Sequence, residues 1–120
     1  MTKLNLYRDS ISEIKKLNRK ILHEIENDLK NITLKMSNIT GVVQPELIKE
    51  KLDKIEELES DQDFWNDASN AAKVQKEKTQ LGRKLDKYSQ AYDAVNDASE
   101  LYQMAKEAKE EESLNARYED

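Results

Sequence analysis

The sequence predicts an all-α fold, and three observations carry this prediction. Its 120 residues include only two Gly and one Pro, so helix-breaking residues are almost absent. Hydrophobic residues make up 37% and charged residues 38%, which is typical of long helices that bury a single stripe. Apolar residues recur every three or four positions, without the alternation of a strand. We therefore expect one helical domain over residues 1–120, an antiparallel bundle of three helices with a very long third helix and the start of a fourth.

The first predicted helix begins near Ser10 or Ser12 and runs to about Asn38. Ser10 and Glu13 have the spacing of a capping box, and residues 1–12 are expected to be disordered in part. Gly41 is expected to end the helix in the left-handed conformation, and Pro45 to start the next one. The apolar residues of this helix are spaced by three or four positions and therefore form one apolar face: Ile14, Leu17, Ile21, Ile25, Leu29, Ile32, Met36 and Ile39.

The second helix is short, and the third follows an aromatic corner. The second has Ile48, Leu52, Ile55 and Leu58 or Glu59 on its inner face. The third is expected from about Asp67 to Lys109, capped by Asn66 or Asp67. Its seam has the alternating spacing that suits left-handed helix pairing, at Leu81, Leu85, Tyr88, Tyr92, Val95, Ser99 and Tyr102. These heptad positions favour a role in the core for the tyrosines over a stacking platform for bases.

Phe64 and Trp65 are the only Phe and the only Trp, and they interrupt the helical pattern between Ser60 and Asp67. Each aromatic side chain hides on the order of 150–250 Å² when packed. We therefore expect both to be buried as a structural motif at the corner between the second and third helices.

Residues 111–118 resemble the start of a fourth helix, with Leu114 and Tyr118 one turn apart. The chain ends before such a helix could bury anything, so we expect it to be the N-terminal fragment of a longer protein. Without that cover, the seam of the third helix would be exposed, and the fragment is expected to self-associate through the third helix.

Catalytic chemistry is not indicated. There is no Cys, and His23 is a lone histidine on a helix, more typical of a surface residue than of a ligand or an acid/base group. The carboxylates occur in runs typical of solvated faces, and no phosphate-binding loop can be formed from Gly41 and Gly82. We expect no enzyme activity, no cofactor and no metal. The N-terminus lacks the apolar core of a signal peptide and no stretch could span a membrane, which predicts a cytoplasmic protein.

Basic residues gather on the third helix although the net charge is −5. They could contact RNA phosphates, but interspersed Glu77 and Asp86 also fit an ordinary solvated helix face. The candidates for a surface that faces RNA are Lys73, Lys76, Arg83, Lys84 and Lys87.

The run from Leu47 to Leu114 resembles the N-terminal domain of the bacterial class-I peptide chain release factors, in their factor-2 branch. The resemblance is carried by residues 52–59 (LDKIEELE), 63–67 (DFWND), 71–78 (AAKVQKEK) and 96–101 (NDASEL). Phe-Trp before an Ala-x-Lys helix is its most specific part. Residues from about Ile14 to Gln44 fit only as a helix, and the first dozen match nothing.

The resemblance implies a translation termination factor that acts at UGA and UAA codons. In that family a Ser-Pro-Phe tripeptide reads the codon and a Gly-Gly-Gln loop promotes peptidyl-tRNA hydrolysis; neither occurs here. What remains is a helical domain that would dock at the stalk base of the large ribosomal subunit, on rRNA and protein. Two alternatives stay open: a free-standing coiled-coil adaptor that dimerises, and a helical RNA-binding protein, which the acidic excess disfavours.

Overall fold

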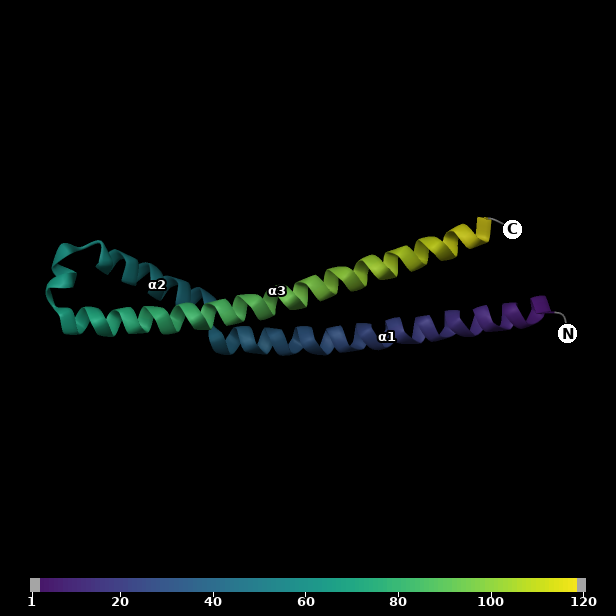
Figure 1. Cartoon of the computed structure of the whole chain (residues 1–120), viewed down its shortest axis with the longest axis horizontal. Helices are drawn as coiled ribbons and strands as arrows, with labels where there is room; N and C mark the ends of the chain where they lie inside the picture. The colour runs from purple at the N-terminus through teal and green to yellow at the C-terminus, as the bar shows by residue number, and fades with distance from the viewer. Residues whose placement is uncertain (1–2, 119–120) are drawn as a thin grey trace. The chain divides into compact units, whose positions relative to one another are not determined.

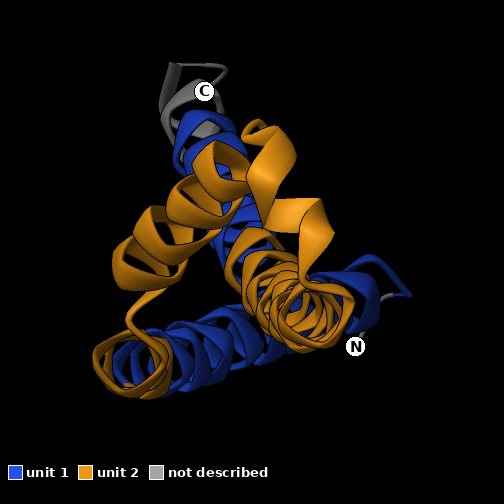
Figure 2. Ribbon diagram, turned by 90° about the vertical axis from the view of Figure 1, so that its left-hand side faces the viewer, with its two compact units in different colours: residues 1–34, 95–120 blue, residues 35–94 orange. Residues whose placement is uncertain are grey.

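The computed structural model describes residues 3–118, and the side chains of residues 3–112. It is all-α, as predicted, and its elements are α1 (Lys3–Val43), α2 (Pro45–Glu59), the 3₁₀ turn η1 (Gln62–Asn66) and α3 (Ala68–Tyr118) (Figure 1). None of the helices described is long and apolar enough to cross a membrane. The chain divides into two compact units (Figure 2): residues up to Leu34 with those from Val95 form unit 1, and Lys35–Ala94 form unit 2.

Helix α1 begins and ends outside its predicted bounds. It starts at Lys3, so residues 3–12 are helical, while residues 1–2 lie outside the described part. At its other end Gly41 stays helical, and Gln44 instead takes the left-handed conformation, with φ of 54° and ψ of 64°. Pro45 disfavours the right-handed helical conformation in the residue before it. The Gln44 N–H donates to the Thr40 carbonyl at 2.9 Å, which is the bond of a left-handed helix end. Pro45 occupies the first turn of α2, as predicted.

The buried core lies in unit 2. Met36 comes from the end of α1, Ile48 and Ile55 from α2, Phe64 from η1 and Ala71 from α3. The Thr40 hydroxyl, which also donates to the Met36 carbonyl, lies 2.7 Å from the Tyr88 hydroxyl and so joins α1 to α3. Near the end of α2, Glu59 rather than Leu58 turns inward: Leu58 is exposed and Glu59 is partly buried.

Unit 1 pairs the first part of α1 with the last part of α3, and none of its described side chains is fully buried. Leu22, Glu26 and Leu29 of α1 are partly buried, as are Ser99 and Tyr102 of α3. The pKa of Glu26 is lowered, mainly by a hydrogen bond from the Tyr102 hydroxyl and next by the positive charge of Lys30. The pKa of Tyr102 is raised. Burial contributes most to this shift, and the hydrogen bond to Glu26 contributes next.

Helix α3 continues through the place where a fourth helix was predicted to begin. It runs unbroken from Ala68 to Tyr118, past both Lys109 and Glu111. Three consecutive Glu residues favour helix, and no Gly or Pro interrupts them. The side chains of Leu114 and Tyr118 lie outside those described.

The seam of α3 is mostly covered, contrary to the expectation of an exposed strip. Its members from Leu81 to Tyr102 are partly buried, except Tyr92, which is exposed. Helix α1 covers part of the seam in both units. In unit 2 Thr40 contacts Tyr88, and in unit 1 Glu26 accepts a hydrogen bond from Tyr102. The prediction of self-association through this seam therefore loses the exposed surface on which it was based.

The corner between α2 and α3 is a capped 3₁₀ turn. The Asp61 carboxylate accepts a bond from the Asp63 backbone N–H at 3.0 Å and so caps η1. The Asp67 carboxylate accepts one from the Asn70 N–H at 3.1 Å and caps α3, as predicted for Asn66 or Asp67. The two caps satisfy backbone donors at both helical starts and fix the direction in which α3 leaves the corner.

Only one of the two corner aromatics is buried. Phe64 is 8% exposed, whereas Trp65 is 50% exposed, so the prediction that Trp65 is buried is wrong. Side chains of consecutive residues in a 3₁₀ turn point about 120° apart, so both cannot enter the same core. Trp65 instead packs edge-on against Phe64, with ring centroids 5.0 Å apart, and its Nε1–H donates to the Glu59 carbonyl at 3.0 Å.

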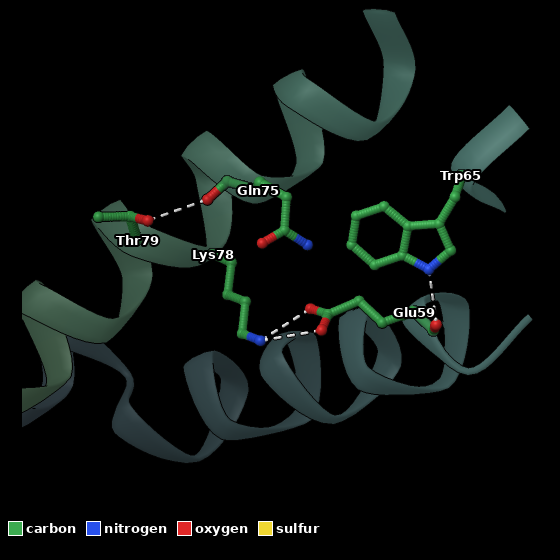
Figure 3. A network of polar contacts seen from close by, with 5 residues as sticks. All are labelled: Glu59, Trp65, Gln75, Lys78 and Thr79. Atoms are coloured by element: carbon green, nitrogen blue, oxygen red, sulfur yellow. Dashed lines mark hydrogen bonds and ion pairs between the residues drawn. The ribbon is translucent and has the colours of Figure 1, made fainter. Parts of the chain in front are cut away.

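An ion pair joins α2 to α3 beside this corner (Figure 3). Lys78 Nζ lies 2.8 Å from Glu59 Oε1 and donates to Oε2 at 3.1 Å. The pKa of Glu59 is lowered, and the hydrogen bond from Lys78 contributes most to this shift. Burial of the carboxylate acts in the opposite direction and raises the pKa. The Gln75 amide also lowers this pKa, although its nitrogen is buried without a hydrogen bond of good geometry among the described residues.

We expect the two aromatics to differ in their effect on stability. Phe64→Ala removes a core side chain and should lower the free energy of unfolding by about 3–5 kcal/mol. Trp65→Ala removes an edge contact and one hydrogen bond, and should lower it by about 1–2 kcal/mol. Urea denaturation followed by circular dichroism measures both. Equal losses in the two variants would contradict the division of roles at the corner.

We also expect the Glu59–Lys78 ion pair to make stability depend on pH. Because the pKa of folded Glu59 lies below its ordinary value of 4.5, the pair stabilises the fold above that pH, and this contribution is lost as pH falls through the lowered pKa. Glu59→Gln should therefore be less stable than the parent at neutral pH and approach it in acid. Thermal unfolding from about pH 7 to pH 3 measures this. The control, Glu56→Gln, changes an exposed carboxylate on the same helix; a gap of constant size for Glu59→Gln would exclude the linkage.

Candidate docking surface on the third helix

The five basic residues proposed to face the ribosome lie on α3 within unit 2, and all are exposed. Because a helix turns by about 100° per residue, steps of three and four return to the same side. Lys73, Lys76, Arg83 and Lys87, with Gln80 between them, follow such steps along the side away from Lys78 and Leu81. Lys84 lies beside Arg83 on the edge of this line. We call Lys73, Lys76, Arg83, Lys84 and Lys87 the basic stripe.

Lys78 does not belong to the basic stripe, although it lies among these residues in the sequence. Its side chain turns towards α2 and pairs with Glu59 (Figure 3). The sequence alone gave no sign of this contact, because Glu59 and Lys78 lie on different helices separated by the corner. The local cluster of basic residues therefore consists of one structural lysine and five that face solvent.

The acidic neighbours do not neutralise the stripe. Glu77 and Asp86 are exposed and adjoin the stripe, because Glu77 follows Lys73 by four residues and Asp86 follows Arg83 by three. Among residues 3–112 the ion pairs are Lys30–Glu26, Lys49–Glu46 and Lys78–Glu59, and none of them uses a stripe residue. The stripe is thus a local concentration of positive charge on a chain with net charge −5.

The corner determines where the stripe begins. The Asp67 cap starts α3 shortly before Lys73, and the buried Phe64 holds the preceding turn in the core of unit 2. The Glu59–Lys78 ion pair then joins α3 to α2 on the side of α3 away from the stripe, and the stripe residues are exposed. Phe64 and Trp65 therefore position the surface rather than form it.

A groove of about 740 Å³ in unit 2 lies beside the α1–α2 junction. Gln44 and Pro45 line one side and Leu85, Tyr88 and Tyr92 the other. The rings of Tyr88 and Tyr92 are stacked, with centroids 5.9 Å apart. Because the Tyr88 hydroxyl is held by Thr40 and the side chain is partly buried, Tyr88 acts as a packing residue, as its heptad position predicted.

The acidic and histidine side chains form no recognisable reactive centre in the described part of the chain. His23 is exposed, and its Nε2 lies 3.5 Å from the Asn27 amide nitrogen on the next turn. No three His, Cys, Asp or Glu residues converge there as metal ligands would.

Comparison with known proteins identifies the family. A profile of the PCRF domain matches residues 48–120. Peptide chain release factor 2 of Sulfurimonas denitrificans is 57% identical over 92 residues, which is 77% of this chain and 25% of that protein. The same factor of Sulfurovum sp. is 49% identical over the same shares, and that of Nitratiruptor sp. is 42% identical over 98 residues, 82% of this chain and 27% of that protein. No solved structure matches.

The chain spans about a quarter of the length of these relatives. The profile begins at Ile48 in α2, and so covers the corner, the Glu59–Lys78 ion pair and the whole basic stripe. The resemblance inferred from the Phe-Trp corner and the helix after it is thereby confirmed. The chain belongs to the PCRF domain family, and the region it represents is the N-terminal region of peptide chain release factor 2.

Proposed function

We propose that this chain is a docking and orienting domain of a translation termination factor. The observation that carries the proposal is that the matched region holds both the corner and the unpaired basic stripe that the corner positions. Its partner would be the stalk base of the large ribosomal subunit, built of rRNA and protein, and its place of action the cytoplasm.

The chemistry of termination would belong to other parts of the full-length factor. Neither a Ser-Pro-Phe nor a Gly-Gly-Gln tripeptide occurs in this sequence. The domain would therefore neither read the UGA or UAA codon nor promote peptidyl-tRNA hydrolysis. Its contribution would be to raise the rate of productive encounter and to limit the orientations in which the factor arrives.

The charge distribution supports binding to an RNA-rich surface. Lysine and arginine contact phosphates without reading sequence, and such contacts weaken as salt rises because counterions are released. The overall negative charge disfavours indiscriminate adhesion to RNA, whereas a local stripe still attracts phosphates within a Debye length of about 8–10 Å. Five exposed cations on one side of a rigid helix are thus suited to steering.

We expect charge reversal on the stripe to slow association of the full-length factor with ribosomes. Lys76→Glu, Arg83→Glu and Lys84→Glu together should lower the association rate constant by about tenfold or more at low salt. The difference should shrink as salt rises, because screening removes steering from parent and variant alike. Stopped-flow measurement of association over a salt series tests this.

The matched control is Lys49→Glu, Lys51→Glu and Lys54→Glu, which reverses three exposed lysines on α2 in the same unit. It should leave the association rate close to that of the parent factor. Stripe and control variants that behave alike at every salt concentration would rule out the basic stripe as the docking surface. Retained helicity by circular dichroism confirms that both variants fold.

A further inference from the structure

The groove beside the α1–α2 junction shares no residue with the basic stripe. One of its walls is formed by the end of α1 and the start of α2, and includes Gln44, Pro45 and Glu46. The other wall is a side of α3, on which Tyr92 and Asp93 are exposed. Both walls belong to unit 2, and the groove measures about 740 Å³. We call it the junction groove.

Tyr92 presents to the junction groove an aromatic ring that is already held in place. Its ring stacks on that of Tyr88, with centroids 5.9 Å apart and planes inclined by 29°. The Tyr88 hydroxyl lies 2.7 Å from the Thr40 hydroxyl, which joins this stack to α1. Tyr92 nevertheless remains 44% exposed. An exposed ring of this kind attracts cations, because the face of an aromatic ring carries partial negative charge.

The charged side chains of the junction groove also favour a cation. They are Glu46, Lys49 and Asp93. Lys49 Nζ lies 3.3 Å from Glu46 Oε1, so these two charges largely offset each other. Asp93 forms no ion pair with any described residue, and the groove therefore keeps the negative charge of its carboxylate.

The end of α1 adds partial negative charge to the same groove. Carbonyl groups in the last turn of a helix lack helical partners, and together they act as roughly half an elementary negative charge. Basic side chains often offset this charge, but the last turn of α1 contains none. Gln44 follows Val43, the last residue of α1, and lines the groove, so this helix end lies at its wall.

We propose that the junction groove binds an arginine side chain of a partner protein. The planar guanidinium group stacks on the exposed ring of Tyr92, and its N–H groups donate to the Asp93 carboxylate. The aliphatic stem of the arginine packs on Leu47, which lines the groove and is 44% exposed. This interaction does not rest on the docking role of the basic stripe, because the two surfaces have no residue in common.

A nucleotide and a lysine fit the junction groove less well than an arginine. A base could stack on Tyr92, but its phosphate would be repelled by the Asp93 carboxylate and by the negative end of α1. A lysine ammonium is attracted by the same charges, but it cannot stack as a plane or donate two parallel hydrogen bonds to one carboxylate. Arginine is therefore the side chain that uses the ring, the carboxylate and the helix end together.

Nuclear magnetic resonance titration of the isotope-labelled chain tests the groove. The probe is N-acetyl-arginine amide, and the control probe is N-acetyl-citrulline amide, which has nearly the same shape but no charge. The arginine probe should shift the backbone amide signals of Gln44, Ser89 and Asp93, which line the groove, until they saturate. N-acetyl-lysine amide should bind more weakly, because it lacks the planar group. Equal shifts with the citrulline probe, or no saturable shift with the arginine probe, would overturn the proposal.

Substitutions assign the binding to the ring and the carboxylate. Tyr92→Leu and Asp93→Asn should each raise the dissociation constant of the arginine probe by about threefold or more, because each removes one of the two main contacts. Tyr92→Phe keeps the aromatic face and should bind like the parent. The control, Asp53→Asn, removes an exposed carboxylate of α2 that does not line the groove. Equal dissociation constants for Asp93→Asn and Asp53→Asn would contradict the assignment, and circular dichroism verifies that each variant stays helical.

The same titration of the full-length factor identifies the source of the arginine. This chain spans about a quarter of the length of its relatives. Binding of the arginine probe by both proteins would show that the junction groove is open to a partner. Binding by residues 1–120 but not by the full-length factor would show that the factor fills its own groove, and would overturn the assignment to a partner protein.

Discussion

The burial of Phe64 at the corner is the interaction on which the rest of unit 2 depends. It anchors the 3₁₀ turn that reverses the chain between α2 and α3, and the reversal brings together groups distant in sequence. Glu59 then meets Lys78, and Thr40 meets Tyr88. Each contact limits the rotation of α3, and together with the buried ring they determine which residues of that helix remain in solvent. Trp65 supports the turn from outside through its bond to the Glu59 carbonyl.

Charge on this protein has two separate uses. The Glu59–Lys78 pair is intramolecular and holds two helices in register, while the basic stripe has no ion-pair partner among the described residues. A lysine that is already paired offers little to a phosphate, because binding would first break the existing contact. Because Lys78 is paired with Glu59, it does not count as a member of the stripe. The five cations that remain have no ion-pair partner among the described residues and can bind phosphates.

The helical class, the proline start of α2, the cap of α3 and the family could be predicted from local sequence, because each depends on residues close together in the chain. Where two signals competed, prediction failed. Gly41 looked like a helix end, but the steric effect of Pro45 on Gln44 decided the boundary. Trp65 looked like a core residue, but the 3₁₀ geometry admits only Phe64. The basic stripe was found by composition, whereas removing Lys78 from it required a contact between helices that no local pattern contains.

The two compact units differ in how the chain builds them. Unit 2 is one continuous segment, so its contacts close short loops, whereas the two pieces of unit 1 are separated by the whole of unit 2. Closing a longer loop costs more entropy, and non-local contacts form more slowly. We therefore expect unit 2 to fold ahead of unit 1. We also expect unit 1 to open at lower cost than unit 2, because none of its described side chains is fully buried.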